Sequence, residues 1–223
     1  MNRVAAVLFD LDQTLLDRSA SLQGFANWQA TRMLRADLDD PEGFVARLIE
    51  LDANGTVWKD EVYATLREEF ALAGWSVAEL LASYELCFCA FSRPREGAAS
   101  AVRALAERGT RLALVSNGRA PFQERNFRAL GFPDAFDAVV VSAAVGLRKP
   151  DARIFEHACT LLGVAPADVV FVGDDPVADM EGARAAGLRT VHVPPESTRA
   201  VCAAADIRVE HLRDLMDAID ALD

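Results

Sequence analysis

The sequence has no run of about 18 apolar residues, the length that a membrane-spanning helix requires, although 52% of its 223 residues are hydrophobic. We therefore expect no membrane segment. Basic residues are few, with 23 Lys and Arg against 34 Asp and Glu, which gives a formal net charge of −11. A surface of this sign argues against nucleic-acid binding. It would suit an enzyme of phosphate esters only if a divalent cation and a few placed basic residues reversed the charge locally.

Cysteine and histidine are also scarce. Cys87, Cys89, Cys159 and Cys202 fit reduced intracellular thiols, and the three histidines have no companion ligands that would indicate a zinc site. The first residues carry no signal-peptide pattern, so a cytoplasmic location is expected. The loops Gly-x-Gly-x-x-Gly and Gly-x-x-x-x-Gly-Lys are absent, as is the Gly-x-Ser-x-Gly elbow. Dinucleotide binding, triphosphate binding by a P-loop and serine hydrolase chemistry therefore have no support.

The uncharged stretch Ala5–Phe9 runs directly into two aspartates, Asp10 and Asp12. A short apolar run with valine and phenylalanine is typical of a strand that is buried on both faces. Asp10 and Asp12 would stand at the carboxyl end of that strand, the edge where open α/β sheets bind ligands. Two carboxylates this close repel each other unless a cation lies between them or one binds a proton, and oxygen ligands suit Mg²⁺. The alternative is a strand that ends in two solvated aspartates.

Residues 93–223 alternate between short apolar runs and helical patterns. This alternation predicts βαβ units, a parallel sheet and helices on both of its faces. The predicted fold class is α/β, a Rossmann-like parallel sheet core with an inserted α-helical cap domain. After the first strand, the strands are expected at 112–115, 138–141, 169–172, 190–193 and near 206–209, and the helices at 98–108, 122–130, 152–162, 178–186 and the C-terminal end.

Residues 17–92 show helical spacing and no convincing strand. Asp39-Asp40-Pro41 indicates a helix start, and Asn54-Gly55 indicates its end. Trp28, Trp58 and Trp75 are expected in the core of this segment. We therefore predict two domains, an α/β core of residues 1–16 and 93–223 and a helical cap of residues 17–92.

Polar residues follow four of the predicted strands. Because the carboxyl ends of parallel strands share one edge of a sheet, these side chains can converge. Carboxylates would hold Mg²⁺, while a hydroxyl and an ammonium group would hold phosphate oxygens. The residues are Asp10 and Asp12 after the first strand, Ser116 and Asn117 after the second, Lys149 after the third, and Asp174, Asp175 and Asp179 after the fourth.

Four stretches, in order, resemble the motifs of the haloacid dehalogenase-like (HAD) superfamily of aspartate-nucleophile phosphohydrolases. They are Asp10-Leu11-Asp12-Gln13-Thr14, Ser116-Asn117, Arg148-Lys149-Pro150-Asp151 and Gly173-Asp174-Asp175-Pro176-Val177-Ala178-Asp179. The similarity covers essentially the whole chain, and the insert resembles the small α-helical cap of the phosphoglycolate phosphatase and nucleotidase branch. This resemblance implies a Mg²⁺-dependent phosphomonoesterase that hydrolyses a small phosphorylated metabolite through an aspartyl-phosphate. We expect no nucleic-acid or membrane partner, and a monomer or homodimer.

The resemblance also implies catalytic roles. Asp10 would be the nucleophile, and Asp12 would be the general acid for the leaving alcohol and then the base for water. Lys149 would neutralise charge on the nucleophile and the phosphate. Asp10, Asp12 (through its backbone carbonyl) and Asp174 would be the ligands of Mg²⁺.

Other matched positions would support these groups. Ser116, Asn117 and Lys149 would bind the phosphoryl group, and Arg18 is a further candidate for substrate contact. Asp175 and Asp179 would lie in the second shell of the metal, where Asp179 orients Lys149 or a metal-bound water.

The sequence departs from the family pattern at two positions. Gln13 stands where glycine is frequent, and Asp175 stands where a small hydroxyl or amide residue is common, which leaves the metal ligand open between Asp174 and Asp175. The alternatives to a phosphatase are a phosphomutase, a 2-haloacid dehalogenase and a non-enzymatic phospho-acceptor or phosphate-binding domain. Asp12 favours phosphate-ester cleavage, because dehalogenases of the superfamily typically lack this second aspartate.

Overall fold

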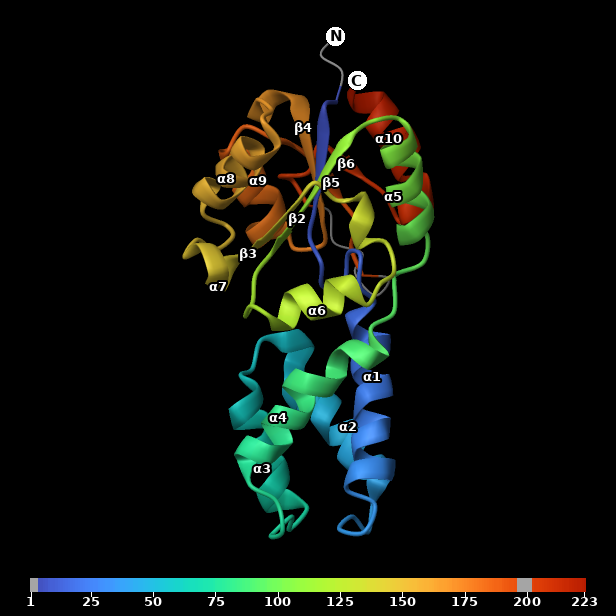
Figure 1. The fold of residues 1–223 in the computed structure, drawn as a ribbon, viewed down its shortest axis with the longest axis vertical. Coiled ribbons are helices and arrows are strands. Elements are labelled where there is room, and N and C mark those ends of the chain that lie inside the picture. Colours follow the sequence, from blue (N-terminus) through green and yellow to red (C-terminus); the bar gives the residue numbers. More distant parts are fainter. Residues whose placement is uncertain (1–3, 196–201) are drawn as a thin grey trace. The chain divides into compact units, whose positions relative to one another are not determined.

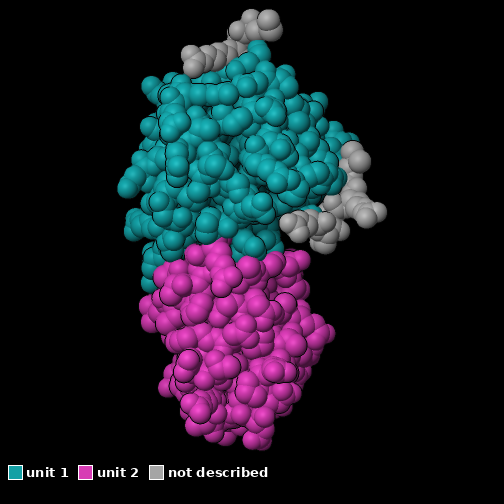
Figure 2. All heavy atoms as spheres, turned by 90° about the vertical axis from the view of Figure 1, so that its right-hand side faces the viewer, with its two compact units in different colours: residues 1–17, 94–223 teal, residues 18–93 magenta. Residues whose placement is uncertain are grey.

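The computed structural model describes residues 4–195 and 202–223. The chain divides into two compact units, residues 1–17 with 94–223 and residues 18–93 (Figure 2). The four cysteines are free. Within the described ranges, every helix is too short or too polar to cross a membrane.

The first unit is built on a six-stranded parallel sheet in the order β3-β2-β1-β4-β5-β6. This confirms the predicted α/β class. Strand order reverses beside β1, which makes the carboxyl edge at this point the topological switch point where such sheets bind ligands. The strands are β1 (Ala6–Phe9), β2 (Arg111–Ser116), β3 (Ala138–Val141), β4 (Val169–Gly173), β5 (Arg189–His192) and β6 (Ile207–Arg208).

Helices cover both faces of this sheet, α8 and α9 on one face and α5 and α10 on the other (Figure 1). Every residue of β1 and β4 is buried, which explains why these strands are continuously apolar rather than alternating. The helices of this unit are α5 (Ala98–Glu107), α6 (Phe122–Arg128), α7 (Ser142–Val145), α8 (Ala152–Leu162), α9 (Gly182–Ala185) and α10 (Leu215–Leu222).

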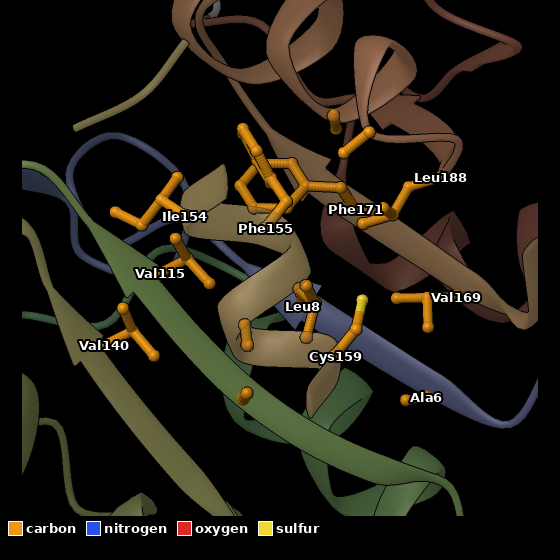
Figure 3. Close-up of a cluster of buried hydrophobic side chains, with 14 of the residues drawn as sticks. Ala6, Leu8, Val115, Val140, Ile154, Phe155, Cys159, Val169, Phe171 and Leu188 are labelled. Atoms are coloured by element: carbon orange, nitrogen blue, oxygen red, sulfur yellow. The ribbon is translucent and has the colours of Figure 1, made fainter. Parts of the chain in front are cut away.

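A cluster of buried side chains joins α8 to the sheet (Figure 3). Phe155 of α8 meets Phe171 of β4 edge to face, with ring centroids 4.9 Å apart. Leu8 of β1 and Cys159 of α8 belong to the same cluster. Each large side chain buried in this way stabilises the unit by roughly 2–3 kcal/mol, so the strands that carry the polar residues rest on a rigid base.

All regular secondary structure among the described residues of the second unit is helical, and turns join the helices. Asp40 caps α2 by accepting a hydrogen bond from the Gly43 N–H at 2.9 Å, and Ser76 with Glu79 forms a capping box at the start of α4. Its segments are α1 (Arg18–Trp28), η1 (Gln29–Met33), α2 (Pro41–Asp52), η2 (Ala53–Gly55), α3 (Lys59–Glu69), α4 (Val77–Cys87) and η3 (Phe88–Phe91).

Some local expectations were wrong. Trp58 is 58% exposed rather than part of the core, because it stands in extended conformation just before α3. The helix expected at 178–186 begins earlier, as the π-helical segment η6 (Pro176–Glu181), and continues into α9. In η6 the Met180 N–H reaches back five residues to the Asp175 carbonyl at 3.2 Å, which widens the turn.

Candidate active site

Asp10 is held at the carboxyl edge of the sheet by the register of β1. Phe9, the last residue of β1, pairs with Leu114 of β2 and Val172 of β4. The Asp10 N–H continues the ladder by donating to the Val172 carbonyl at 2.9 Å. Asp10 is only 6% exposed, so its carboxylate has lost most of its water and depends on protein partners.

Lys149 supplies the main positive charge beside Asp10. Its Nζ lies 2.5 Å from Asp10 Oδ1 and 2.7 Å from Asp179 Oδ1, and the residue is 3% exposed. Asn117 holds the main chain at this point, because its Nδ2 donates to the Lys149 carbonyl and its Oδ1 accepts from the Lys149 N–H, both at 3.0 Å. The Asn117 side chain, which we predicted to bind substrate, therefore positions Lys149.

Asp174 and Asp175 follow β4 but make different contacts. Asp175 is exposed, and its Oδ1 caps η6 by accepting from the N–H groups of Val177 and Ala178, both at 2.8 Å. Asp174 is half-buried, and its carboxylate lies close to those of Asp10 and Asp179. Of the two residues, only Asp174 joins the acidic group, while Asp175 caps the helix; that Asp174 is the metal ligand stays a prediction.

Asp179 is fixed by the loop that follows β4. Its Oδ2 accepts hydrogen bonds from the N–H groups of Asp174 and Asp175, both at 3.1 Å. A Cβ atom at Gly173 would lie 2.3 Å from the same Oδ2, so only glycine leaves room for this carboxylate. Asp179 therefore supports both the loop and Lys149, and its place in the second shell of a metal stays a prediction.

The site carries more negative charge than its protein groups neutralise. Burial first, and then Asp10 and Asp179, raises the pKa of Asp174 to about 9. Burial, Asp179 and Asp12 raise the pKa of Asp10 to about 7 against the opposing charge of Lys149. Burial alone would lower the pKa of Lys149, but Asp10 and Asp179 outweigh it and raise that pKa.

One oxygen from each of Asp10, Asp174 and Asp179 lies within 4.8 Å of the others. A hexacoordinate Mg²⁺ spans about 4.2 Å between opposite ligands, so small side-chain shifts would let a single cation be shared. The all-oxygen donor set and the excess of two negative charges over Lys149 fit such a cation. Asp179 Oδ1 faces Lys149 and its Oδ2 accepts from the loop, and the assignment of Asp10 and Asp174 as direct ligands stays a prediction.

Asp12 and Ser116 are joined by Gln123 of α6. The Gln123 Nε2 donates to Asp12 Oδ2 at 2.7 Å and to Ser116 Oγ at 3.0 Å, and it lies 3.1 Å from the Asn117 carbonyl oxygen. Sequence reasoning missed Gln123, which follows no strand. A glutamine in the first turn of a helix gave no signal that its side chain returns to the edge of the sheet.

His192 is a second residue that the sequence did not single out for the site. It ends β5, is 1% exposed, and its Nε2 lies 2.9 Å from the Asp174 backbone carbonyl. It therefore steadies the main chain that carries Asp174.

Arg18 belongs to the helical unit, where its guanidinium makes two hydrogen bonds to Asp52 at 2.7 and 2.8 Å. Lys59 pairs with the same carboxylate. Arg18 is 7% exposed and has a structural task in this network. Its contact with substrate stays a prediction.

The fold and this edge of the sheet define an α/β enzyme with an acidic site at its switch point. A family model described as haloacid dehalogenase-like hydrolase matches residues 4–187. The chain therefore belongs to the haloacid dehalogenase-like hydrolase family, as its four motifs predicted.

Individual relatives agree with this assignment. The chain is 30% identical to N-acetylmuramic acid 6-phosphate phosphatase of Pseudomonas aeruginosa over 98% of this chain and 96% of that protein. It is 40% identical to phosphoserine phosphatase of Thermus thermophilus, but over only 48% of this chain and 44% of that protein. Among solved structures, the HAD-hydrolase YfnB of Bacillus subtilis, crystallised with magnesium, is similar in fold, with a TM-score of 0.75, 20% identity, and coverage of 98% of this chain and 99% of that one.

Proposed function

We propose that the protein is a Mg²⁺-dependent phosphomonoesterase that hydrolyses a small phosphorylated metabolite through an aspartyl-phosphate on Asp10. The names of the relatives support phosphatase chemistry. The observation that carries the proposal is the cluster of Asp10, Asp174, Asp179 and Lys149, in which the three carboxylates, once ionised, leave two negative charges for a divalent cation to balance.

Asp10 is the group that attacks. The ammonium group of Lys149 opposes the effect of burial on the pKa of Asp10, which favours the ionised carboxylate, and it faces the charge that develops on the phosphoryl oxygens. Asp10 and Asp174 hold the metal, with the Asp12 carbonyl as a further ligand. When bound, Mg²⁺ supplies Lewis-acid polarisation of the phosphoryl group and offsets the repulsion between substrate and carboxylates.

Asp12 gives its proton to the oxygen of the leaving alcohol and takes one from the water that then cleaves the acyl-phosphate. Ser116, which is 1% exposed at the end of β2, binds a phosphoryl oxygen through its hydroxyl. The presence of a carboxylate at position 12 favours this chemistry over dehalogenation, in which no alcohol has to be protonated.

We propose further that residues 17–92 act as a cap that selects the substrate and excludes bulk water during the first step. Arg18 is the cap residue that we would test first for substrate contact. A cytoplasmic location and a monomeric or homodimeric state complete the proposal.

The test is phosphate release from a panel of phosphorylated metabolites and from an aryl phosphate, with Mg²⁺ and after chelation. We expect turnover with Mg²⁺ only, and none in Asp10→Asn, whose amide cannot attack phosphorus. Asp175→Asn is the matched control, because Asn also caps a helix, and it should keep turnover. Metal-independent turnover of a haloacid would indicate a dehalogenase. Transfer of the phosphoryl group without release of free phosphate would indicate a mutase, and a long-lived phosphoprotein would indicate a phospho-acceptor domain.

A further inference from the structure

Gln123 is a buried amide that the roles above do not use. It lies in α6 and is 3% exposed. Its Nε2 sits between Asp12 Oδ2 at 2.7 Å and Ser116 Oγ at 3.0 Å. In the mechanism proposed above, these two oxygens belong to the general acid and to the phosphoryl-binding group.

The turn before α6 is shaped around this side chain. Gly118 has φ +150°, and a Cβ atom there would lie 2.7 Å from Gln123 Cγ. Any other residue at position 118 would push the glutamine away from the edge of the sheet. Within the described part of the chain, Gln123 Oε1 is buried and has no hydrogen-bond partner. Among the described residues, the Gln123 amide therefore makes its hydrogen bonds through Nε2, the atom that faces Asp12 and Ser116.

We propose that Gln123 is a positioning residue that fixes the Asp12 carboxylate at a set distance from Ser116, and so sets where the proton of the acid meets the leaving oxygen. This inference rests on the proposed function. Asp12 is only half-buried, so without a donor its side chain is free to turn towards water. A hydrogen bond to an ionised carboxylate is strong enough to select one rotamer.

The effect should fall on the acid step. Protonation of the leaving group matters little when a stable phenolate departs and much when an aliphatic alkoxide departs. A displacement of a catalytic group by about 1 Å can cost about 100-fold in rate. Loss of the Gln123 contact should therefore lower kcat for aliphatic phosphates by about 10- to 100-fold and for an aryl phosphate by only a few-fold.

The experiment compares kcat and KM for p-nitrophenyl phosphate and for the best aliphatic ester of the panel. Gln123→Met keeps the length of the side chain and removes the donor, and Gln123→Glu is a second variant should the first fail to fold. Asn126→Leu is the control, because Asn126 lies on the same helix and is 1% exposed, and its amide atoms contact no hydrogen-bond partner among the described residues. The control should leave the ratio of the two substrates unchanged.

Equal losses on both substrates would overturn the proposal, since they would place the effect on binding or on folding. In an Asp12→Asn background, Gln123→Met should cost almost nothing more, because both changes remove the same function. Additive losses would likewise refute the link to Asp12.

Crystal structures of the wild type and of Gln123→Met give a readout that is independent of turnover. We expect the Asp12 carboxylate to leave its position beside Ser116, and an unmoved carboxylate would contradict the positioning role. If the wild type released no phosphate from any ester, the proposed function would fail, while this structural comparison would still decide whether Gln123 places Asp12.

Discussion

Replacing Asp174 with asparagine should stabilise the metal-free protein while removing its response to Mg²⁺. The pKa of Asp174 rises from 3.8 to about 9 on folding, because burial and the neighbouring carboxylates disfavour its charge. The folded state therefore binds a proton that the unfolded state has lost between about pH 4 and pH 9. Stability of the metal-free wild type must fall as pH rises through this window.

The magnitude follows from the same shift. Holding a proton at pH 7 on a carboxyl group with an unfolded pKa of 3.8 costs about 4 kcal/mol as an upper limit. Because Asp174 is half-buried and screened by solvent, we expect Asp174→Asn to gain about 1–3 kcal/mol in free energy of unfolding at pH 7. Near pH 4 the Asp174 carboxyl is protonated in the folded state and about half protonated in the unfolded state, so most of the gain should vanish.

Mg²⁺ should reverse the order of the two proteins. A ligand at about 1,000 times its Kd stabilises the folded state by about 4.1 kcal/mol, and only the wild type retains both Asp10 and Asp174 to bind it. Asp175→Asn is the matched control, because Asp175 caps η6 and Asn can do the same, so its stability should stay within about 0.5 kcal/mol and its Mg²⁺ response should persist.

The assay is urea unfolding at pH 4, 7 and 8, with and without Mg²⁺. Far-ultraviolet circular dichroism is the signal of choice, because all three tryptophans lie within residues 18–93 and their fluorescence reports on the helical unit alone. The role assigned to the Asp174 charge would be refuted if Asp174→Asn were no more stable than the wild type at pH 7 without metal. It would also be refuted if the gain in free energy of unfolding were as large at pH 4 as at pH 7.

Two further substitutions test the ion pairs that Asp179 and Asp52 form with basic side chains. Gly173→Ala should lower phosphate release by at least about 100-fold, because the added Cβ would displace Asp179 Oδ2 and with it the partner of the catalytic lysine; unchanged turnover would contradict this. Asp52→Asn should cost about 3–5 kcal/mol in free energy of unfolding at pH 7, because it removes the buried carboxylate that the buried Arg18 and the half-buried Lys59 share. Burial would raise the pKa of Asp52, but these two cations lower it. The cost should therefore disappear as pH falls below about 4 through that lowered pKa, which tryptophan fluorescence can follow.

Much of the fold could be predicted from short stretches of the sequence. The strand expected at 169–172 and the helix expected at 152–162 are present as β4 and α8. Both are set by side chains within one element, since a strand buried on two faces needs a continuous apolar run and a helix needs periodic apolar positions. The start of η6 and the exposure of Trp58 were missed, because apolar periodicity reveals neither the Asp175 cap that begins η6 nor the extended backbone of Trp58 before α3.

The candidate site shows the same limit. Asp174 and Asp175 are identical and adjacent, and sequence could not rank them. The structure separates them because Asp175 caps η6 while Asp174 joins the acidic group. Gln123 stands seven residues beyond Ser116 and outside every motif, and it reaches Asp12 only because α6 turns back over the sheet edge.

The sequence by itself determined that polar residues follow successive buried strands of a parallel sheet, and hence that they share one edge. It could do so because strand burial and residue order are local properties. Only the tertiary structure decided which carboxylates pair with Lys149 and that the Gln123 amide binds Asp12. It also decided that the Arg18 guanidinium pairs with Asp52 within the helical unit. Those outcomes depend on contacts between segments that are up to 139 residues apart in the sequence. At such contacts, charge repulsion, the loss of water and the available space together determine which groups meet.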